Sequence, residues 1–145
     1  MKILVANLGS TSFKYRLFEM DAGEERLLAQ GGYERVQDYG EVIRDALSTM
    51  EGSGAVASQS EIAAVGFKTV LGRNLSGCVE AGDEVLEALE GFAEVAPAHN
   101  PAYAAGIRQF GDILPGARRV ALFETAFYQW VPEAGTRYAV PQAWY

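Results

Sequence analysis

A short polar segment near the N-terminus combines the residue types that bind phosphate. Its hydroxyl-bearing residues are Ser10, Thr11 and Ser12, with Asn7 before them and Lys14 after them. Small side chains allow backbone N–H groups to approach an anion, and the hydroxyls and the ammonium add further donors. The amide of Asn7 can hold a metal ion directly or through water. The same residues also fit an ordinary β-hairpin turn, and the glycine spacing is not that of a P-loop.

Three further polar residues stand where binding sites are common. His99 directly precedes the expected start of a helix, where partial positive charge favours a neutral imidazole. Glu124 follows an apolar run, at the carboxyl end of a strand, and a carboxylate there can act as a base or support a metal. Lys68 interrupts another apolar run and points either at solvent or at an anionic ligand. Structural roles also fit: a loop hydrogen bond for His99, and a surface or helix-start acid for Glu124.

The segments that would position these residues show strand and helix patterns in turn. Apolar and alternating runs predict strands over residues 2–8, 13–19, 25–36, 62–70 and 119–123. Helical spacing of apolar residues predicts helices over residues 38–50, 83–95 and 100–111, with loops over 51–60 and 71–82. This order predicts an α/β domain with a mixed sheet that begins as an antiparallel β-meander and is flanked by helices.

Two of the helices have clear start signals. Asp38 can cap the first helix, and Glu41 stands three residues later, at the spacing of a capping box. Asn100 followed by Pro101 predicts a second sharp start, with Asn100 as the cap and proline at the first helical position. After Pro132 the pattern predicts no element.

Composition limits the classes of function. The chain has 145 residues, which favours one domain, and its formal net charge of -7 weighs against a nucleic-acid partner. With Cys78 as the only cysteine and His99 as the only histidine, no internal disulfide or multi-thiolate zinc site can form. No apolar stretch approaches the roughly 20 residues that span a bilayer, and no signal peptide is recognisable. We therefore expect a cytoplasmic protein with no membrane partner.

Four segments, taken together and in order, resemble the motifs of the acetokinase family, the acetate, propionate and butyrate kinases. The chain reads N-L-G-S-T-S-F-K-Y, V-A-P-A-H-N-P-A, L-F-E-T-A-F-Y-Q-W-V-P and Y-A-V-P. The family reads N-x-G-S-S-S-x-K-Y, L-A-P-L-H-N-P, V-F-D-T-A-F-H-Q-x-x-P and Y-x-L-P. The match extends over nearly the whole chain and is far more specific than any one motif.

The resemblance implies an actin-like ATPase (ribonuclease H-like) fold and a magnesium-dependent transfer of phosphate between ATP and a short-chain carboxylate such as acetate or propionate. By motif position, Asn7 matches the family's magnesium-contacting asparagine and Lys14 the lysine assigned to ATP. Lys68 stands at an arginine that binds the carboxylate, and Glu124 at a catalytic aspartate. We expect His99 on the substrate side, and the hydroxyls of residues 10–12 on the phosphates of the nucleotide.

The chain departs from the family around the expected substrate pocket. The family's G-H-R-V-V-H-G-G reads G-F-K-T-V-L-G-R here, so Phe67 and Leu71 replace histidines and Arg73 replaces a glycine. Lys68 keeps the charge of the arginine but loses the bidentate fork that matches a carboxylate. Glu124 keeps the carboxylate of the aspartate but moves it by one methylene, a shift that can weaken positioned chemistry.

Family members are much longer than this chain, and their second domain carries the adenosine pocket, an H-G-T-S-H segment and an arginine that stabilises the transferring phosphoryl group. We therefore expect residues 1–145 to be an N-terminal domain without its nucleotide-base-binding partner, and to be inactive alone. Its expected partners are ATP, the carboxylate, and a missing C-terminal domain or a homodimer partner. The alternative function is a non-catalytic acetokinase-like binding or assembly module.

Overall fold

Six strands form one mixed sheet in the computed structural model, which describes residues 1–144. The strands are β1 (Lys2–Leu8), β2 (Ser12–Asp21), β3 (Glu24–Glu34), β4 (Ile62–Thr69), β5 (Gly77–Glu80) and β6 (Arg118–Phe123), in the spatial order β3-β2-β1-β4-β6-β5. The first three strands pair antiparallel, β1, β4 and β6 run parallel, and β5 is antiparallel to β6. The expected mixed sheet with an N-terminal meander is confirmed.

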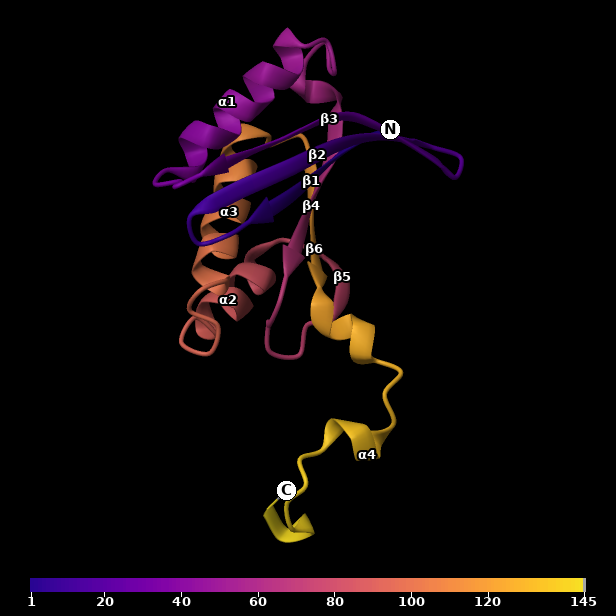
Figure 1. The fold of residues 1–145 in the computed structure, drawn as a ribbon, viewed down its shortest axis with the longest axis vertical. Helices are drawn as coiled ribbons and strands as arrows, with labels where there is room; N and C mark the ends of the chain where they lie inside the picture. Colours follow the sequence, from indigo (N-terminus) through magenta and orange to yellow (C-terminus); the bar gives the residue numbers. More distant parts are fainter. Residues whose placement is uncertain (145) are drawn as a thin grey trace.

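The main helices lie along one face of this sheet (Figure 1). They are α1 (Tyr39–Gly52), α2 (Asp83–Gly91) and α3 (Asn100–Ile113). Helix α3 packs against both of the other helices and against β1, β4 and β6. The opposite face of β1, β2 and β4 therefore has no helix over it within residues 1–144, and Asn7, Lys14 and Lys68 are exposed there.

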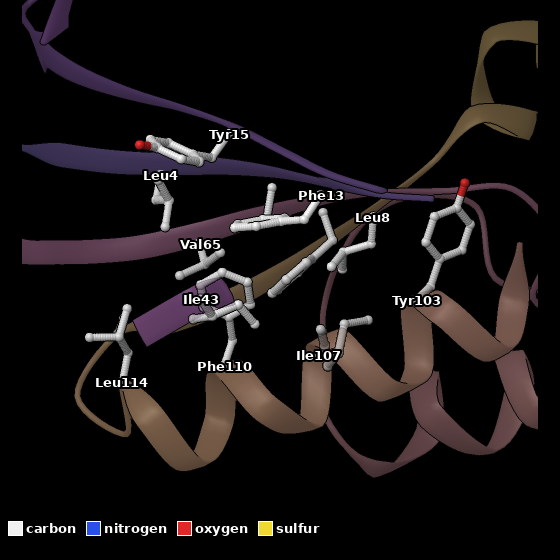
Figure 2. Close-up of a cluster of buried hydrophobic side chains, with 14 of the residues drawn as sticks. Leu4, Leu8, Phe13, Tyr15, Ile43, Val65, Tyr103, Ile107, Phe110 and Leu114 are labelled. Carbon is white, nitrogen blue, oxygen red and sulfur yellow. The ribbon is translucent and has the colours of Figure 1, made fainter. Parts of the chain in front are cut away.

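Strand alternation and helix periodicity place the apolar side chains between these two layers. Figure 2 shows Ile107 and Phe110 of α3 against Leu8, Phe13 and Val65 of the strands. At Gly106 of α3, an added Cβ would lie 2.3 Å from Leu8 Cδ1, so the missing side chain allows the helix to approach β1 closely. This contact brings the middle of α3 close to the end of β1.

The structure corrects one loop prediction. Residues 77–80, expected within a loop, form β5 at the edge of the sheet, where Cys78 pairs with Leu122 and Val79 with Ala121. Gly77 enters this strand with a φ of +76°, a left-handed conformation that glycine adopts without strain. A strand of four residues between glycines has too few positions to show a periodicity, and it forms because β6 offers an edge to pair with.

Two helix boundaries also differ from prediction. Helix α2 ends at Gly91 and not at residue 95, because glycine has low helix propensity and Pro97 disfavours helical backbone before it. Asp38 caps α1 as expected, accepting a hydrogen bond from the Glu41 N–H at 3.2 Å. Asn100, in contrast, is the first helical residue of α3 and does not act as its cap.

The side chain of Asn100 instead joins three segments. Its amide Nδ2 donates to the carbonyls of Leu71, at 3.0 Å, and Leu89, at 3.1 Å, and the residue is fully buried. The position before it is occupied by His99, whose side chain makes no capping hydrogen bond. The start of α3 is therefore fixed by Asn100 from within the core.

Beyond Phe123 the chain leaves the sheet. A short 3₁₀ turn (Glu124–Tyr128), helix α4 (Glu133–Thr136) and a last 3₁₀ turn (Gln142–Trp144) extend away from the main body (Figure 1). This part carries large exposed apolar side chains: Phe127, Tyr128, Trp130, Tyr138 and Trp144. None of the helices within residues 1–144 has the length and apolar character needed to cross a membrane.

Candidate functional site

The predicted site residues of three strands lie in one row on the sheet face opposite the helices. Asn7 of β1 pairs with Lys14 of β2. Ala6 pairs with Phe67 of β4 in the parallel ladder, so the next residues, Asn7 and Lys68, lie side by side on the other face of the sheet. All three polar side chains are exposed, in agreement with this alternation. Asn7 and Lys68, far apart in the sequence, thus share one surface.

A groove lies over the Asn7 and Lys14 end of this row. It has a volume of about 660 Å³, and Val5, Arg16 and Gly32 also line it. Lys14 Nζ lies 3.5 Å from a carboxylate oxygen of Glu34, with the two side chains 61% and 68% exposed. An exposed ion pair of this kind contributes roughly 0–1 kcal/mol. The ammonium of Lys14 can therefore leave Glu34 for a phosphate at little cost.

The turn between β1 and β2 is held by backbone hydrogen bonds. Gly9 N–H donates to Ser12 O at 2.7 Å, Val36 N–H donates to Thr11 O at 2.9 Å, and the Tyr39 hydroxyl donates to Gly9 O. An added Cβ at Gly9 would lie 2.6 Å from Ser12 Oγ, so a side chain there would displace the Ser12 hydroxyl. The turn is a hairpin turn, and the exposed hydroxyls of Ser10 and Thr11 remain available to a ligand.

The hairpin turn meets the segment that carries His99. Ser10 lines a small pocket together with Tyr39, Pro97 and Pro101, on the approach to α3. His99 itself is exposed, and its ring stacks on the ring of Tyr103, one helical turn further along, at a centroid distance of 6.1 Å and an interplanar angle of 19°. His99 therefore lies beside the end of the sheet but on the helix side of it.

Lys68 and Glu124 form an ion pair at the carboxyl ends of β4 and β6. Lys68 Nζ lies 3.0 Å from Glu124 Oε1, and the two side chains are 46% and 49% exposed. The hydrogen bond with Glu124 raises the pKa of the Lys68 ammonium, and partial burial opposes this shift. The lysine is therefore firmly cationic at neutral pH, and it places a positive charge at the two strand ends.

Tyr103 is a residue of this site that the sequence analysis missed. Burial raises the pKa of its phenol, Lys68 lowers that pKa, and Glu124 raises it, so the hydroxyl lies within electrostatic reach of both members of the ion pair. Tyr103 stands four residues after His99, on the same face of α3. The i, i+4 spacing from His99 was the only indication of this residue in the sequence. A single tyrosine in a helix is equally compatible with an ordinary core position.

The substitutions that distinguish this chain do not all face the site. Phe67 is 1% exposed and packs edge-on against Phe110, with centroids 5.4 Å apart, in the core under the helices. Leu71 contributes its backbone carbonyl, which accepts a hydrogen bond from the side chain of Asn100. Of the changes in the motif around β4, Lys68 is the one whose side chain lies in the row described above.

Comparison with known proteins identifies the family. The model of the acetokinase family matches residues 29–145. The chain belongs to the acetokinase family. The acetate kinases of Shouchella clausii and Thermotoga petrophila are 34% and 35% identical to it, over 99% and 100% of the chain. The chain spans about two fifths of the length of these curated relatives, 42% in each case.

Solved acetokinase-family structures share the fold. The acetate kinase of Porphyromonas gingivalis superposes with a TM-score of 0.86 at 35% identity, over 99% of this chain and 42% of that one. A propionate kinase from Francisella tularensis gives a TM-score of 0.73 at 28% identity, over 97% and 41% of the two chains. The six-stranded mixed sheet with its helices is thus the actin-like ATPase arrangement that the resemblance implied.

The acetokinase-family site offers few protein ligands for a metal ion. Within residues 1–144, no three side chains of His, Cys, Asp or Glu come together as a metal cluster. Mg²⁺ does not need such a cluster, because it keeps several waters and is commonly held by one or two protein oxygens and the phosphates of a substrate. The amide oxygen of Asn7, on the open sheet face near Lys14, fits that pattern.

Proposed function

We propose that this acetokinase-family chain is the N-terminal part of a carboxylate kinase, which transfers phosphate between ATP and a short-chain carboxylate such as acetate or propionate. The observation that carries the proposal is the row of Lys14, Asn7 and Lys68 on one open sheet face, with Glu124 at its edge. Phosphoryl transfer relies on positioned positive charge more than on covalent chemistry by the protein. The two lysines of this row, beside a carboxylate, would supply that charge.

The phosphate side of the proposed site is the hairpin and its groove. Lys14 would contact the phosphates of ATP, and the hydroxyls of Ser10, Thr11 and Ser12 would add hydrogen bonds at the turn. Asn7 would hold Mg²⁺, which supplies charge neutralisation between phosphate oxygens when bound. The fixed turn supports this role, because donors that need no rearrangement stabilise developing charge most effectively.

The carboxylate side is the pair of Lys68 and Glu124. Lys68 would bind the substrate carboxylate in place of Glu124, and the half-exposed ion pair would cost roughly 1 kcal/mol or less to open. Glu124, once released, would lie beside the reacting group as a base or a partner for the metal. His99, whose ring stacks on Tyr103, would line the substrate side.

The curated relatives are more than twice as long as the part that matches this chain. We propose that the remaining part of such a kinase binds the base and completes the charge around the phosphoryl group. The 145 residues alone would then show little or no turnover. In a homodimer, a second copy of the protein would contribute to completing the site.

A second proposal is a non-catalytic binding or assembly module. The Lys68–Glu124 ion pair favours it, because the carboxylate of the protein occupies the cation that the substrate would need. In that case a nucleotide would bind without turnover. The two proposals differ in one measurable respect, the formation of an acyl phosphate.

The test is an assay for acyl phosphate on the protein as its gene encodes it, with ATP, Mg²⁺ and each C2–C5 carboxylate. We expect turnover with at least one acid, and a loss of at least a hundredfold in Lys68→Met. Arg108→Met is the matched control, because Arg108 forms a comparable half-exposed ion pair with Glu90, on helices α3 and α2 and outside the row that contains Lys68. No product with any of these acids would reject the kinase proposal and leave the binding module.

A further inference from the structure

Tyr103 combines deep burial with a free polar end. The residue is 2% exposed, near the start of α3. Figure 2 shows its ring standing beside Leu8, with the hydroxyl at the end of the ring that is furthest from α3. The side chain thus reaches from the helix layer to the level of the strand ends, where Lys68 and Glu124 lie.

The hydroxyl of Tyr103 has no hydrogen-bond partner among residues 1–144. Two other polar side-chain atoms in this part of the chain are unpaired and fully enclosed, Thr69 Oγ1 and Asn100 Oδ1, and the Tyr103 oxygen is not one of them. The oxygen therefore stays accessible although the ring is buried. Because no protein group among these residues occupies it, this donor is available to a ligand at the strand ends.

The position of Tyr103 near the Lys68–Glu124 pair indicates what kind of ligand its hydroxyl would meet. The Tyr103 phenol interacts with the positive charge of Lys68 and with the negative charge of Glu124, and burial raises its pKa, so it stays protonated and can donate. Lys68 carries a compact charge without the fork of an arginine, and binds one oxygen of a carboxylate well but does not orient the second. A second donor nearby would complete two-point recognition.

We propose that the Tyr103 hydroxyl donates a hydrogen bond to the carboxylate of the acid substrate while Lys68 neutralises its charge. Tyr103 is then a substrate-binding residue that compensates for the missing arginine fork. The inference rests on the proposed carboxylate kinase function and names a further contact of the same site. The hydroxyl meets the carboxylate group and not the alkyl tail, so its contribution is the same for acids of different length.

The test is Tyr103→Phe in the protein as its gene encodes it, since phenylalanine keeps the buried ring. We expect the KM for the carboxylate to rise about tenfold, the scale of one hydrogen bond to a charged group. The KM for ATP should stay within twofold, and acetate and propionate should be affected equally. Tyr33→Phe is the control, because the Tyr33 hydroxyl bonds to Asp45, away from the strand ends.

A carboxylate KM within twofold of the unaltered protein would overturn the inference, as would an effect on propionate alone. A calorimetric titration of the protein with propionate separates this outcome from failure of the proposed function. If the unaltered protein makes no acyl phosphate but binds propionate, and Tyr103→Phe weakens that binding about tenfold, the contact stands and the kinase proposal falls. If the unaltered protein binds no propionate, both fall.

Discussion

At the scale of single residues, the structure separates substitutions that alter the site from those that alter the scaffold. Lys68 and Glu124 meet at 3.0 Å, so two changes from the family pattern act on one interaction. The lysine and glutamate side chains together span the distance between the ends of β4 and β6. Each neutralises the charge of the other when no substrate is bound. Phe67, by contrast, fills the core against Phe110. The same motif therefore carries both kinds of change.

At Arg73, a residue with a side chain adopts a backbone conformation that favours glycine, and this strains the backbone. It stands where the family pattern has glycine and adopts a φ of +53°, in the left-handed region. We expect Arg73→Gly to raise the free energy of unfolding by about 0.5–1 kcal/mol, because relief of the steric strain exceeds the added entropy of the unfolded glycine. Urea denaturation measures the change.

Arg73→Ala is the control for this prediction, since alanine removes the guanidinium near Gly91 but keeps a Cβ at the strained position. It should gain no stability. An alanine variant as stable as the glycine variant would show that the side chain, and not the backbone, is responsible.

Candidate site residues could be predicted from the sequence where one residue type in a motif would carry the chemistry. Lys14, Lys68 and Glu124 were predicted in this way, and the sheet register brings Asn7, Lys14 and Lys68 into one row. Tyr103 could not be predicted, because its proposed role depends on how α3 packs at the end of β1. A tyrosine at a buried helical position has no sequence signal that separates packing from binding.

At the scale of elements, long periodic segments were predictable and short or context-dependent ones were not. The meander, α1 and β4 have enough residues for alternation or helical spacing to be clear. Strand β5 has four residues and forms because β6 offers an edge. Asn100 has the residue type of a helix cap, but its buried position redirects the amide to Leu71 and Leu89. In each of these cases tertiary contacts decided the local structure.

Asn100 joins the loop after β4, the end of α2 and the start of α3. We expect Asn100→Ala to lower the free energy of unfolding by about 2–4 kcal/mol, because two carbonyls lose their donor in the interior and a cavity is left. Thermal and urea unfolding measure this loss. Asn74→Ala is the matched control, since Asn74 is exposed and should change stability by less than about 0.5 kcal/mol.

Equal stabilities of the Asn100→Ala and Asn74→Ala proteins would mean that the two hydrogen bonds to Leu71 and Leu89 add nothing to the stability of the fold. The position of α3 would then depend on apolar packing alone.

At the scale of the whole molecule, the helices cover one face of the sheet and the proposed site uses the other (Figure 1). The curated relatives continue well beyond the matched part. A site on an open face is suited to closure by another part of a kinase, since phosphoryl transfer benefits when water is excluded. The exposed aromatic residues after Phe123 lie on the segment that extends away from the main body (Figure 1).

Tyrosine burial makes the stability of the whole fold sensitive to high pH. Burial raises the pKa of Tyr15, Tyr33, Tyr39 and Tyr103, and a hydrogen bond to Asp45 adds to the shift at Tyr33. The unfolded chain releases these phenolic protons near the ordinary value of about 10, while the folded chain still holds them. Stabilisation is therefore fully present below pH about 10 and is lost as the pH rises above it.

We expect the urea midpoint to be level between pH 7 and 9 and to fall steeply from pH 10 to 11. Each phenol that stays protonated in the folded chain contributes a slope of up to about 1.4 kcal/mol per pH unit. Tyr33→Phe should reduce the loss of stability between pH 8 and 11 by about 1 kcal/mol, because phenylalanine has no proton to release. At pH 8 the same variant reports only the lost hydrogen bond to Asp45, so the difference between the two pH values isolates ionisation. An identical fall in both proteins would place the alkaline sensitivity in groups other than Tyr33.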